Sequence, residues 1–327
     1  MAGGMAYRNV GRSGLKLSRV GLGSWLTFGA GVDRTTTAAC VRAALDAGIN
    51  FFDTADAYAH GEAERLLGET LRGARRQDLV IATKAFFPMS EDVNDRGLSR
   101  KHLFASLHGS LERLGTDYVD LFQCHRYDVE TPLEEVVLAM DDLVRQGKTL
   151  YWGVSCWSAA QIVDTVRTAR AFGAHPPISN QPPYNMLERS IEAEVVPISE
   201  REGLSQVVFS PLAEGLLTGK YDSLTPPAGS RAASERFGRF LRPRLTPENL
   251  RRVEALAALA RDAGRPLSHL ALAWCLRLPN IASVITGATR PEQVTENAAA
   301  AAFELSPDLL ARIERVLDNA PSSAPFA

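Results

Sequence analysis

The sequence has few cysteines, no excess of either charge and no long hydrophobic run. None of its four cysteines stands in a CxxC pair, which argues against a disulfide framework or a zinc site, and we predict no metal ligands. The formal net charge of −2 gives no general reason to expect nucleic acid or a membrane as partner. No apolar stretch approaches the roughly 18 residues of a membrane span, and residues 1–10 lack the apolar centre of a signal peptide. We therefore expect a cytoplasmic protein without membrane insertion.

Two common nucleotide-binding motifs are also missing. Residues 21–26 read GLGSWL and lack the third glycine of the GxGxxG fingerprint. Gly219 and Lys220 resemble the end of a phosphate-binding loop, but Tyr221 stands where that loop needs Ser or Thr. These departures disfavour a doubly wound sheet, which is the main alternative architecture.

Short apolar runs alternate with amphipathic stretches along the whole chain. The hydrophobic content of 45% and the charged content of 23% are ordinary for a globular protein and exclude long disorder. Most of the apolar runs are bounded by Gly, Pro or polar residues, as buried parallel strands are. They predict strands that begin near Val20, Phe51, Leu79, Val119, Leu150, Ile178, Val207 and Ile281.

Helical spacing of apolar residues appears between these runs. Ser99 is a predicted N-cap, and glycines that follow the helical stretches are typical C-terminal stops. The pattern predicts helices over residues 35–47, 63–71, 100–114, 132–146, 158–172, 191–202, 250–263, 267–278 and 309–317.

Eight strand–helix units in one chain favour a (β/α)8 TIM barrel, with residues 1–327 forming a single domain. Residues 7–18 predict an N-terminal hairpin over the floor of the barrel, and the last helices are additions to it. Residues 213–247, after the seventh strand, form an unusually long connection rich in Pro, Gly, Ser and Arg. We interpret it either as a solvated loop or as a lid that binds an anion.

Four reactive residues fall at or near the carboxyl ends of three neighbouring predicted strands, where barrels place their functional side chains. They are Asp53, Tyr58, Lys84 and His125. Each has an ordinary structural explanation by itself, as a turn cap, a packed aromatic, a surface lysine or a satisfied histidine. Their coincidence at adjacent strand ends favours a catalytic site.

The chemistry of this cluster suits carbonyl reduction. A phenol has a pKa near 10, and a cation about 4 Å away is expected to lower it by roughly 3 units. Lys84 supplies that cation, Asp53 orients Lys84, and His125 donates a hydrogen bond to a carbonyl oxygen. Tyr58 then protonates that oxygen. Because no side chain provides a hydride, a nicotinamide cofactor is required.

The sequence resembles the aldo-keto reductases over almost its whole length. The most specific match is residues 48–58, GINFFDTADAY, followed by Gly61 and Leu67-Gly68. Residues 21–25, 97–101, 151–153, 273–277 and 291–293 are most similar to the group that contains potassium-channel β subunits. In this family the catalytic tetrad is Asp, Tyr, Lys and His, so the resemblance assigns these roles to Asp53, Tyr58, Lys84 and His125.

The resemblance also implies a set of cofactor contacts. Basic residues beside an adenosine phosphate favour NADPH/NADP+ over NADH, because a dianion needs charge-assisted partners. Arg231 matches the 2′-phosphate contact of the family and Phe209 the ring-stacking position. By position, the set comprises Ser24, Trp25, Ser155, Gln181, Phe209, Ser210, Leu212, Gly215, Lys220, Arg231, Gly287, Thr289, Gln293, Glu296 and Asn297.

Some residues depart from the family pattern. Cys156 stands where many relatives carry Asn, so one contact to the nicotinamide amide is in doubt. The histidine is absent from many channel-associated relatives, so His125 argues for an NADPH-dependent reductase of aldehydes or ketones. A regulatory subunit that senses the nucleotide, with slow or no turnover, is the alternative, and a Schiff-base aldolase that uses Lys84 is a third.

The sequence leaves the small carbonyl substrate and the oligomeric state open, and a homo-oligomer is among the states it allows. Arg126 is a candidate for holding an acidic group of the substrate. The full set of candidate specificity residues is Trp25, Phe86, Phe87, Arg126, Tyr127, Trp157 and Tyr184.

Overall fold

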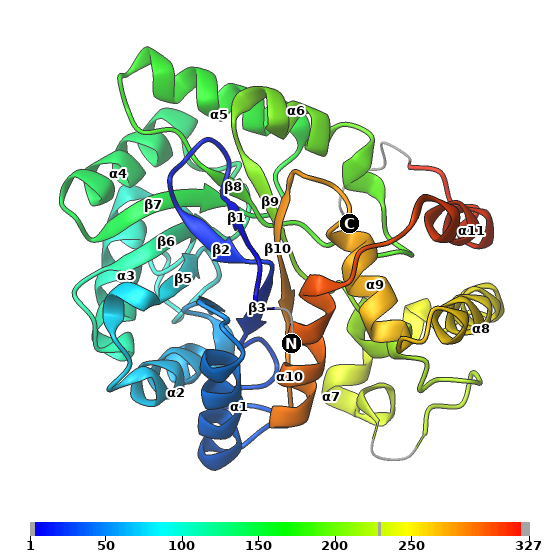
Figure 1. Ribbon diagram of the computed structural model, residues 1–327. Coiled ribbons are helices and arrows are strands. Elements are labelled where there is room, and N and C mark those ends of the chain that lie inside the picture. Colours follow the sequence, from blue (N-terminus) through cyan, green and yellow to red (C-terminus); the bar gives the residue numbers. More distant parts are fainter. Residues whose placement is uncertain (1–3, 228–229, 322–327) are drawn as a thin grey trace.

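A computed structural model describes residues 4–227 and 230–321 of the chain. Eight parallel strands close into a barrel in the order β10-β3-β4-β5-β6-β7-β8-β9, surrounded by helices (Figure 1). The predicted (β/α)8 barrel is therefore confirmed, and the doubly wound sheet is excluded. Each strand begins within two residues of its predicted start: β3 (Val20–Gly23), β4 (Phe51–Asp53), β5 (Val80–Ala85), β6 (Val119–Cys124), β7 (Thr149–Val154), β8 (Ser179–Asn180), β9 (Ser205–Val208) and β10 (Ile281–Thr286).

The N-terminal hairpin closes one end of the barrel. Strands β1 (Tyr7–Asn9) and β2 (Lys16–Ser18) pair antiparallel, as predicted, and cross in front of the barrel strands in Figure 1. Val10 and Leu17 are fully buried and pack with inward-facing strand residues such as Phe51 and Leu121. Side chains therefore fill the end of the barrel that the hairpin covers. The open end is the opposite one, at the carboxyl ends of the strands.

Helices α1 to α6 alternate with the strands and carry the expected end signals. Ser99 caps α3 by accepting a hydrogen bond from the His102 amide at 3.2 Å. Gly48, Gly147 and Gly173 follow helix ends and have φ between 62° and 77°, where glycine is favoured. The bounds are α1 (Arg34–Asp46), α2 (Glu62–Leu71), α3 (Arg100–Leu114), α4 (Leu133–Arg145), α5 (Ala159–Ala171) and α6 (Val195–Glu202).

The helix predicted over residues 191–202 is the least accurate. A separate 3-10 turn, η3 (Ser190–Glu192), precedes α6, which begins only at Val195. Pro197 has no amide hydrogen to donate, so it fits the first turn of a helix and not its interior. The helix therefore starts two residues before this proline.

The segment after β9 is long, and its described residues contain only short helices. It runs through η4 (Ala213–Thr218), η5 (Arg231–Ala233), α7 (Glu235–Gly238) and η6 (Arg242–Arg244). The ring of Phe240 meets that of Trp25, which follows β3, with centroids 4.9 Å apart. The segment therefore reaches the open end of the barrel, and we call residues 213–246 the lid segment.

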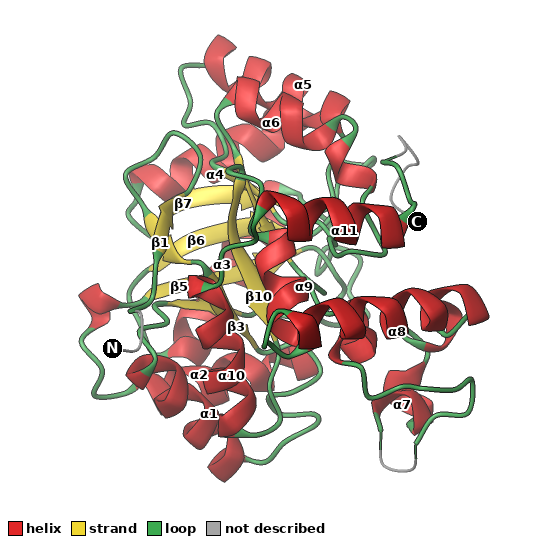
Figure 2. Ribbon diagram, turned by 45° about the vertical axis from the view of Figure 1, so that its right-hand side comes forward, coloured by secondary structure: helices red, strands yellow, loops and turns green. Residues whose placement is uncertain are grey.

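The remaining helices are α8 (Pro247–Asp262), α9 (Leu267–Cys275), α10 (Pro291–Ala299) and α11 (Pro307–Leu317). Figure 2 shows α8 and α11 side by side on one flank of the barrel. Helix α9 is buried throughout, because it lies between the barrel and these outer helices.

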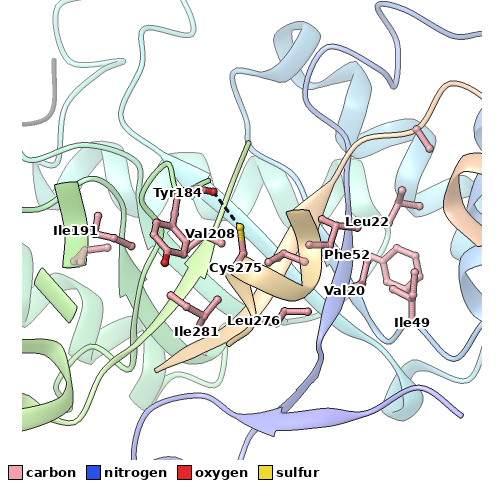
Figure 3. Packing of buried hydrophobic residues seen from close by; sticks show 14 of the residues in the cluster. Val20, Leu22, Ile49, Phe52, Tyr184, Ile191, Val208, Cys275, Leu276 and Ile281 are labelled. Atoms are coloured by element: carbon pink, nitrogen blue, oxygen red, sulfur yellow. Dashed lines mark hydrogen bonds between the residues drawn. The ribbon is translucent and has the colours of Figure 1, made fainter. Parts of the chain in front are cut away.

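A second apolar layer lies between the strands and the surrounding helices. Successive residues of a strand point to opposite faces, so Val20, Leu22 and Val208 face outward into this layer. Figure 3 shows Cys275 of α9 packed beside β9 and β10, with its thiol 3.7 Å from the carbonyl oxygen of Tyr184. The strands are thus packed on both faces, against side chains inside the barrel and against the surrounding helices.

Candidate active site

The four predicted catalytic residues lie together at the open end of the barrel. Lys84 of β5 is fully buried, and its ammonium group donates to Asp53 Oδ2 at 2.7 Å and to the carbonyl oxygen of Thr54 at 2.8 Å. The same Nζ lies 3.3 Å from the hydroxyl oxygen of Tyr58. The ring of His125, directly after β6, meets that of Tyr58 edge to face with centroids 5.6 Å apart. Strand register brings the residues together, because β4, β5 and β6 are neighbours.

The electrostatics of the cluster differ in one respect from the expectation. Burial raises the pKa of Tyr58 above its ordinary value, and the positive charge of Lys84 offsets only part of that rise. The predicted net lowering of this pKa is therefore wrong for the structure, although the predicted contact exists. Burial is the largest single influence on the pKa of Lys84 and acts to lower it, but the contacts with Asp53 and Tyr58 together outweigh burial and the pKa is raised. The lysine is an ammonium ion and the tyrosine a neutral phenol at neutral pH.

His125 is neutral for a related reason. Burial, followed by the positive charges of Lys84 and Arg126, holds the pKa of its imidazole well below the usual value. A neutral imidazole carries one N–H group and one acceptor nitrogen. Its buried Nδ1 has no hydrogen-bond partner among the residues that the structure describes. The ring can therefore donate one hydrogen bond to a carbonyl oxygen without carrying a charge.

Gln181 links the tetrad to the proposed amide-binding residues. Its side-chain Nε2 donates to Asp53 Oδ1 at 2.8 Å, and its backbone oxygen accepts from the hydroxyl of Ser155 at 2.8 Å. Cys156, which has a φ of 57°, donates its backbone N–H to the same oxygen at 3.2 Å. Gln181 thus contacts the tetrad directly and Ser155 through Gln181, while the binding of a nicotinamide amide by this pair stays a prediction.

Sequence reasoning missed two groups at this site. Gln123 is fully buried, and its Oε1 lies 3.5 Å from Gln181 Nε2. Its position two residues before His125 could have identified it, because side chains two residues apart along a strand point to the same face, here into the barrel. The backbone oxygen of Thr54 accepts a hydrogen bond from Lys84, and its hydroxyl oxygen accepts one from the hydroxyl of Ser24 at 2.9 Å. The contact to Lys84 could not be read from the residue type, because every residue has a backbone oxygen.

The start of the lid segment bends sharply around the ammonium group of Lys220. Ser210, Ala213 and Glu214 all have positive φ, and Gly215 has a φ of 102°. A Cβ atom at Gly215 would lie 3.3 Å from the Nζ of Lys220, so the bare glycine makes room for this ammonium group. Among the described residues, no carboxylate forms an ion pair with Lys220. A bend with an unneutralised cation fits a pyrophosphate group.

The other predicted contacts of this stretch are accessible. Phe209 and Leu212 are half-buried, so part of the Phe209 ring is open to a stacking partner. The hydroxyl of Ser210 donates to Glu214 at 2.7 Å, and Glu214 also pairs with Arg244 at 3.0 Å. These polar contacts hold the bend in its shape.

The cations of the lid segment are only partly available to a ligand. Arg242 donates to the carbonyl oxygens of Ala232 and Ser234 and therefore ties the segment to itself. Arg239 lies over the ring of Phe240 at 4.7 Å. The side chain of Arg231, the predicted 2′-phosphate contact, lies outside the part of the chain that the structure describes.

The predicted adenosine-end residues gather at the start of α10 and in the loop before it. Gln293 caps this loop by accepting hydrogen bonds from the amide and hydroxyl of Thr289 at 2.8 and 3.2 Å. Glu296 accepts from Ser268 of α9 at 2.8 Å. Asn297 is buried and Gly287 is exposed.

Two of the candidate specificity residues lie too deep to line a pocket. Tyr184 is fully buried, stacks on Trp274 with centroids 5.2 Å apart, and donates to Glu192 at 2.6 Å. Trp157 is also fully buried and packs against Tyr127. Both predictions are therefore wrong, because aromatic rings beside a strand end can equally face the outer core.

Other expectations concern membranes and metals. No helix in residues 4–227 and 230–321 is long and apolar enough to cross a membrane. Within the same ranges, no three His, Cys, Asp or Glu side chains gather as a metal site would require.

Comparison with known proteins is consistent with this geometry. Residues 19–318 match the model of the aldo/keto reductase family. A protein from Oryza sativa subsp. japonica, described as a probable voltage-gated potassium channel subunit beta, is 44% identical over 322 residues, covering 97% of this chain and 98% of that protein. A protein of the same description from Arabidopsis thaliana is 42% identical over 322 residues, with the same coverage.

A putative voltage-gated potassium channel subunit beta from Schizosaccharomyces pombe is 41% identical over 325 residues, covering 96% of this chain and 94% of that protein. The family match, these full-length similarities and the barrel with its four convergent side chains agree. This chain belongs to the aldo/keto reductase family.

Proposed function

We propose that the protein reduces aldehydes or ketones to alcohols, with NADPH as the reductant. The observation that carries this proposal is the contact of Lys84 Nζ with both Asp53 at 2.7 Å and Tyr58 at 3.3 Å inside a closed barrel. NADPH, when bound, would supply the hydride, and the tetrad would orient the carbonyl group and protonate its oxygen.

Each member of the tetrad has one task in this proposal. The neutral ring of His125 donates a hydrogen bond to the carbonyl oxygen and orients the substrate. Tyr58 transfers its phenolic proton to that oxygen as the carbonyl carbon is reduced. The buried ammonium group of Lys84 stabilises the phenolate that remains, and Asp53 holds the ammonium group in place. The phenolate then takes a proton from solvent.

The pKa directions support the reductive direction. Because burial keeps the pKa of Tyr58 above its ordinary value, the phenol is protonated across the neutral range and is ready to donate. An aldolase needs an uncharged lysine as nucleophile. Lys84 is held as an ammonium ion by Asp53 and the carbonyl oxygen of Thr54, which disfavours a Schiff base.

Several residues suit the cofactor. Lys220 and the bend at Gly215 would hold the pyrophosphate, Phe209 would cover one face of the nicotinamide, and Ser155 with Gln181 would hold its amide. Arg231 would select NADPH over NADH through the 2′-phosphate. The remaining predicted contacts, at Ser24, Trp25 and the residues near α10, would hold the rest of the cofactor.

The direct test is a panel of aldehydes and ketones incubated with the purified protein and NADPH, with nicotinamide oxidation followed by absorbance. We expect saturable oxidation that depends on the carbonyl compound and yields the alcohol in equal amount. Negligible oxidation across the panel, with intact NADPH binding, would contradict the proposal. That result would instead favour the alternative, a nucleotide-binding regulatory subunit, and the similar proteins are themselves described as channel subunits.

A further inference from the structure

Arg126 lies directly beside the tetrad and uses little of its hydrogen-bonding capacity. It follows His125 in the chain, and its Nη1 donates to the His125 carbonyl oxygen at 2.6 Å. Its guanidinium carbon lies 5.6 Å from the centre of the Phe87 ring. Among the described residues, the contact to His125 is its one hydrogen bond. Because a guanidinium group has five N–H donors, most of them are available to a ligand.

No acidic side chain neutralises this arginine. The carboxylate of nearby Asp128 accepts hydrogen bonds from Leu98, Glu130 and Thr131 at 2.7 to 2.9 Å, so its oxygens are occupied. In the residues that the structure describes, no Asp or Glu oxygen lies within ion-pair distance of Arg126. The positive charge acts on the site, since it is one of the causes that hold the pKa of His125 low.

Aromatic rings connect this cation to the proton donor. The rings of Tyr58 and His125 meet edge to face at 5.6 Å, His125 and Phe87 at 4.9 Å, and Phe87 and Phe86 at 5.4 Å between centroids. Phe86 and Phe87 are only half-buried. A row of aromatic rings, each meeting the next edge to face, therefore extends from the reacting end of the site to the cation of Arg126, and we call this row the aromatic wall.

We propose that Arg126 is a specificity-determining residue that binds an anionic group of the substrate, so that the preferred substrates are aryl aldehydes or ketones carrying a carboxylate. The aryl ring lies on the aromatic wall, the carbonyl points to Tyr58 and His125, and the carboxylate receives the free N–H donors of Arg126. This inference rests on the proposed function and assigns its substrate class.

The test compares 4-formylbenzoate with its methyl ester, which has the same ring and aldehyde but no charge. The measured quantity is the ratio of kcat/KM for the carboxylate to kcat/KM for the ester, determined for each protein. Comparing this ratio between variants cancels the difference in intrinsic reactivity of the two aldehydes. The variants are Arg126→Met, which removes the charge but retains a long side chain, and Arg126→Lys. Arg42→Met removes the same charge from the exposed face of α1 and is the matched control.

We expect Arg126→Met to lower the ratio by about tenfold to a hundredfold, the usual effect of losing a hydrogen bond to a charged group. The loss should fall mainly on KM for the carboxylate. Arg126→Lys should retain part of the ratio, because lysine keeps the charge but not the planar fork, and Arg42→Met should leave it unchanged. An equal ratio in the natural protein and Arg126→Met would overturn the inference, while turnover of the ester would still support the proposed function.

If neither aldehyde is reduced, a binding measurement decides whether Arg126 binds an anion, while the carbonyl panel decides the proposed function. Benzoate is titrated by calorimetry into the protein mixed with NADP+, for the natural chain and for the same three variants. A loss of affinity of about tenfold or more in Arg126→Met alone would support an anion site at Arg126. Equal benzoate affinity in all four proteins would overturn it.

Discussion

Tyr58 and Lys84 are both buried, and burial opposes the charged form of each. For Tyr58 burial is stronger than the neighbouring cation, so the pKa is raised. For Lys84 burial is again the largest influence, but Asp53 at 2.7 Å and Tyr58 together outweigh it, so that pKa is raised as well. The outcome is one protonated donor and one fixed cation within 3.3 Å of each other. At the scale of single residues, Tyr58 holds the proton to be donated. The ammonium group of Lys84 lies where it stabilises the phenolate oxygen that remains after the proton has left.

Replacing Tyr58 with Phe tests this arrangement. The variant keeps the ring against His125 and removes only the hydroxyl, so we expect carbonyl reduction to fall by about 10²- to 10⁴-fold, the usual contribution of general acid catalysis. NADPH affinity should change little. Steady-state kinetics and a fluorescence titration of NADPH measure the two effects. Tyr118→Phe is the control, because Tyr118 lies directly before β6, at the end away from His125. Unchanged turnover in Tyr58→Phe would show that Tyr58 is not the proton donor.

The segment that carries Tyr58 is held in place by buried polar residues that the mechanism does not use. Asp56 is fully buried, accepting from Ser106 Oγ of α3 and from the Ala57 amide, both at 2.6 Å. Nearby, Glu64 of α2 accepts from Thr83 at 2.5 Å and from Arg113 at 2.6 Å. These contacts tie the loop between β4 and α2 to α3 and thereby fix the position of the proton donor.

Asp56 makes the stability of this element depend on pH. Burial, together with the negative charge of Glu64, raises the pKa of Asp56 to about 7 despite its hydrogen bonds, against roughly 4 in an unfolded chain. Between these two values the folded chain binds a proton that the unfolded chain has lost. Stability from this group is therefore complete below about pH 4 and decreases as the pH rises towards 7.

Asp56→Asn should remove that dependence, because an amide resembles the protonated carboxyl group. We expect the variant to gain stability relative to the natural protein as the pH rises from about 5 to about 8. Urea unfolding at both pH values measures the difference in free energy. The exposed Asp117→Asn is the control and should show no such trend. A constant difference between Asp56→Asn and the natural protein would contradict the shifted pKa.

Gly68 determines how closely α2 approaches α3. A Cβ atom at this position would lie only 2.3 Å from the backbone oxygen of Leu114, and backbone cannot move aside as a side chain can. Gly68→Ala should therefore destabilise the protein by about 1–3 kcal/mol, although alanine favours helix formation by up to about 1 kcal/mol. Gly109→Ala in α3 is the matched control, since its new Cβ would meet the guanidinium group of Arg113. Equal destabilisation of the two variants would argue against a backbone clash.

At the scale of the whole molecule, the described strands form a closed barrel, and the lid segment reaches its open end. Phe240 contacts Trp25 across this end, while Ala232 and Leu241 are fully buried. A ligand bound beneath the lid segment would therefore contact both the barrel and the lid. Because such a ligand binds only the folded chain, it should stabilise the entire fold.

We expect NADPH at about 100 times its Kd to stabilise the protein by about 2.7 kcal/mol and to raise its Tm. At equal concentration NADH should raise the Tm less. Arg231→Ala should reduce the shift with NADPH towards that with NADH, because the 2′-phosphate loses its charged partner. Arg239→Ala, in the same segment, is the control. If Arg231→Ala weakens the effects of both nucleotides equally, recognition of the 2′-phosphate by Arg231 is excluded.

The order of strands and helices could be predicted from the chain because it depends on local periodicity, capping residues and glycine stops. The tetrad followed from it, since neighbouring parallel strands end at the same edge and Asp53, Lys84 and His125 all stand at strand ends. The broken helix before α6 was less accessible, because a single proline inside an apolar pattern does not say on which side the helix begins.

Tertiary structure alone decided the properties that depend on packing between distant segments. Examples are the raised pKa of Tyr58, the hydrogen bond from Gln181 to Asp53 and the burial of Trp157 and Tyr184. Whether Arg126 meets a counter-ion is another, because it depends on where the oxygens of Asp128 are occupied. Local pattern specifies which residues reach the open end of the barrel, whereas desolvation and charge pairing arise only when the strands close around them.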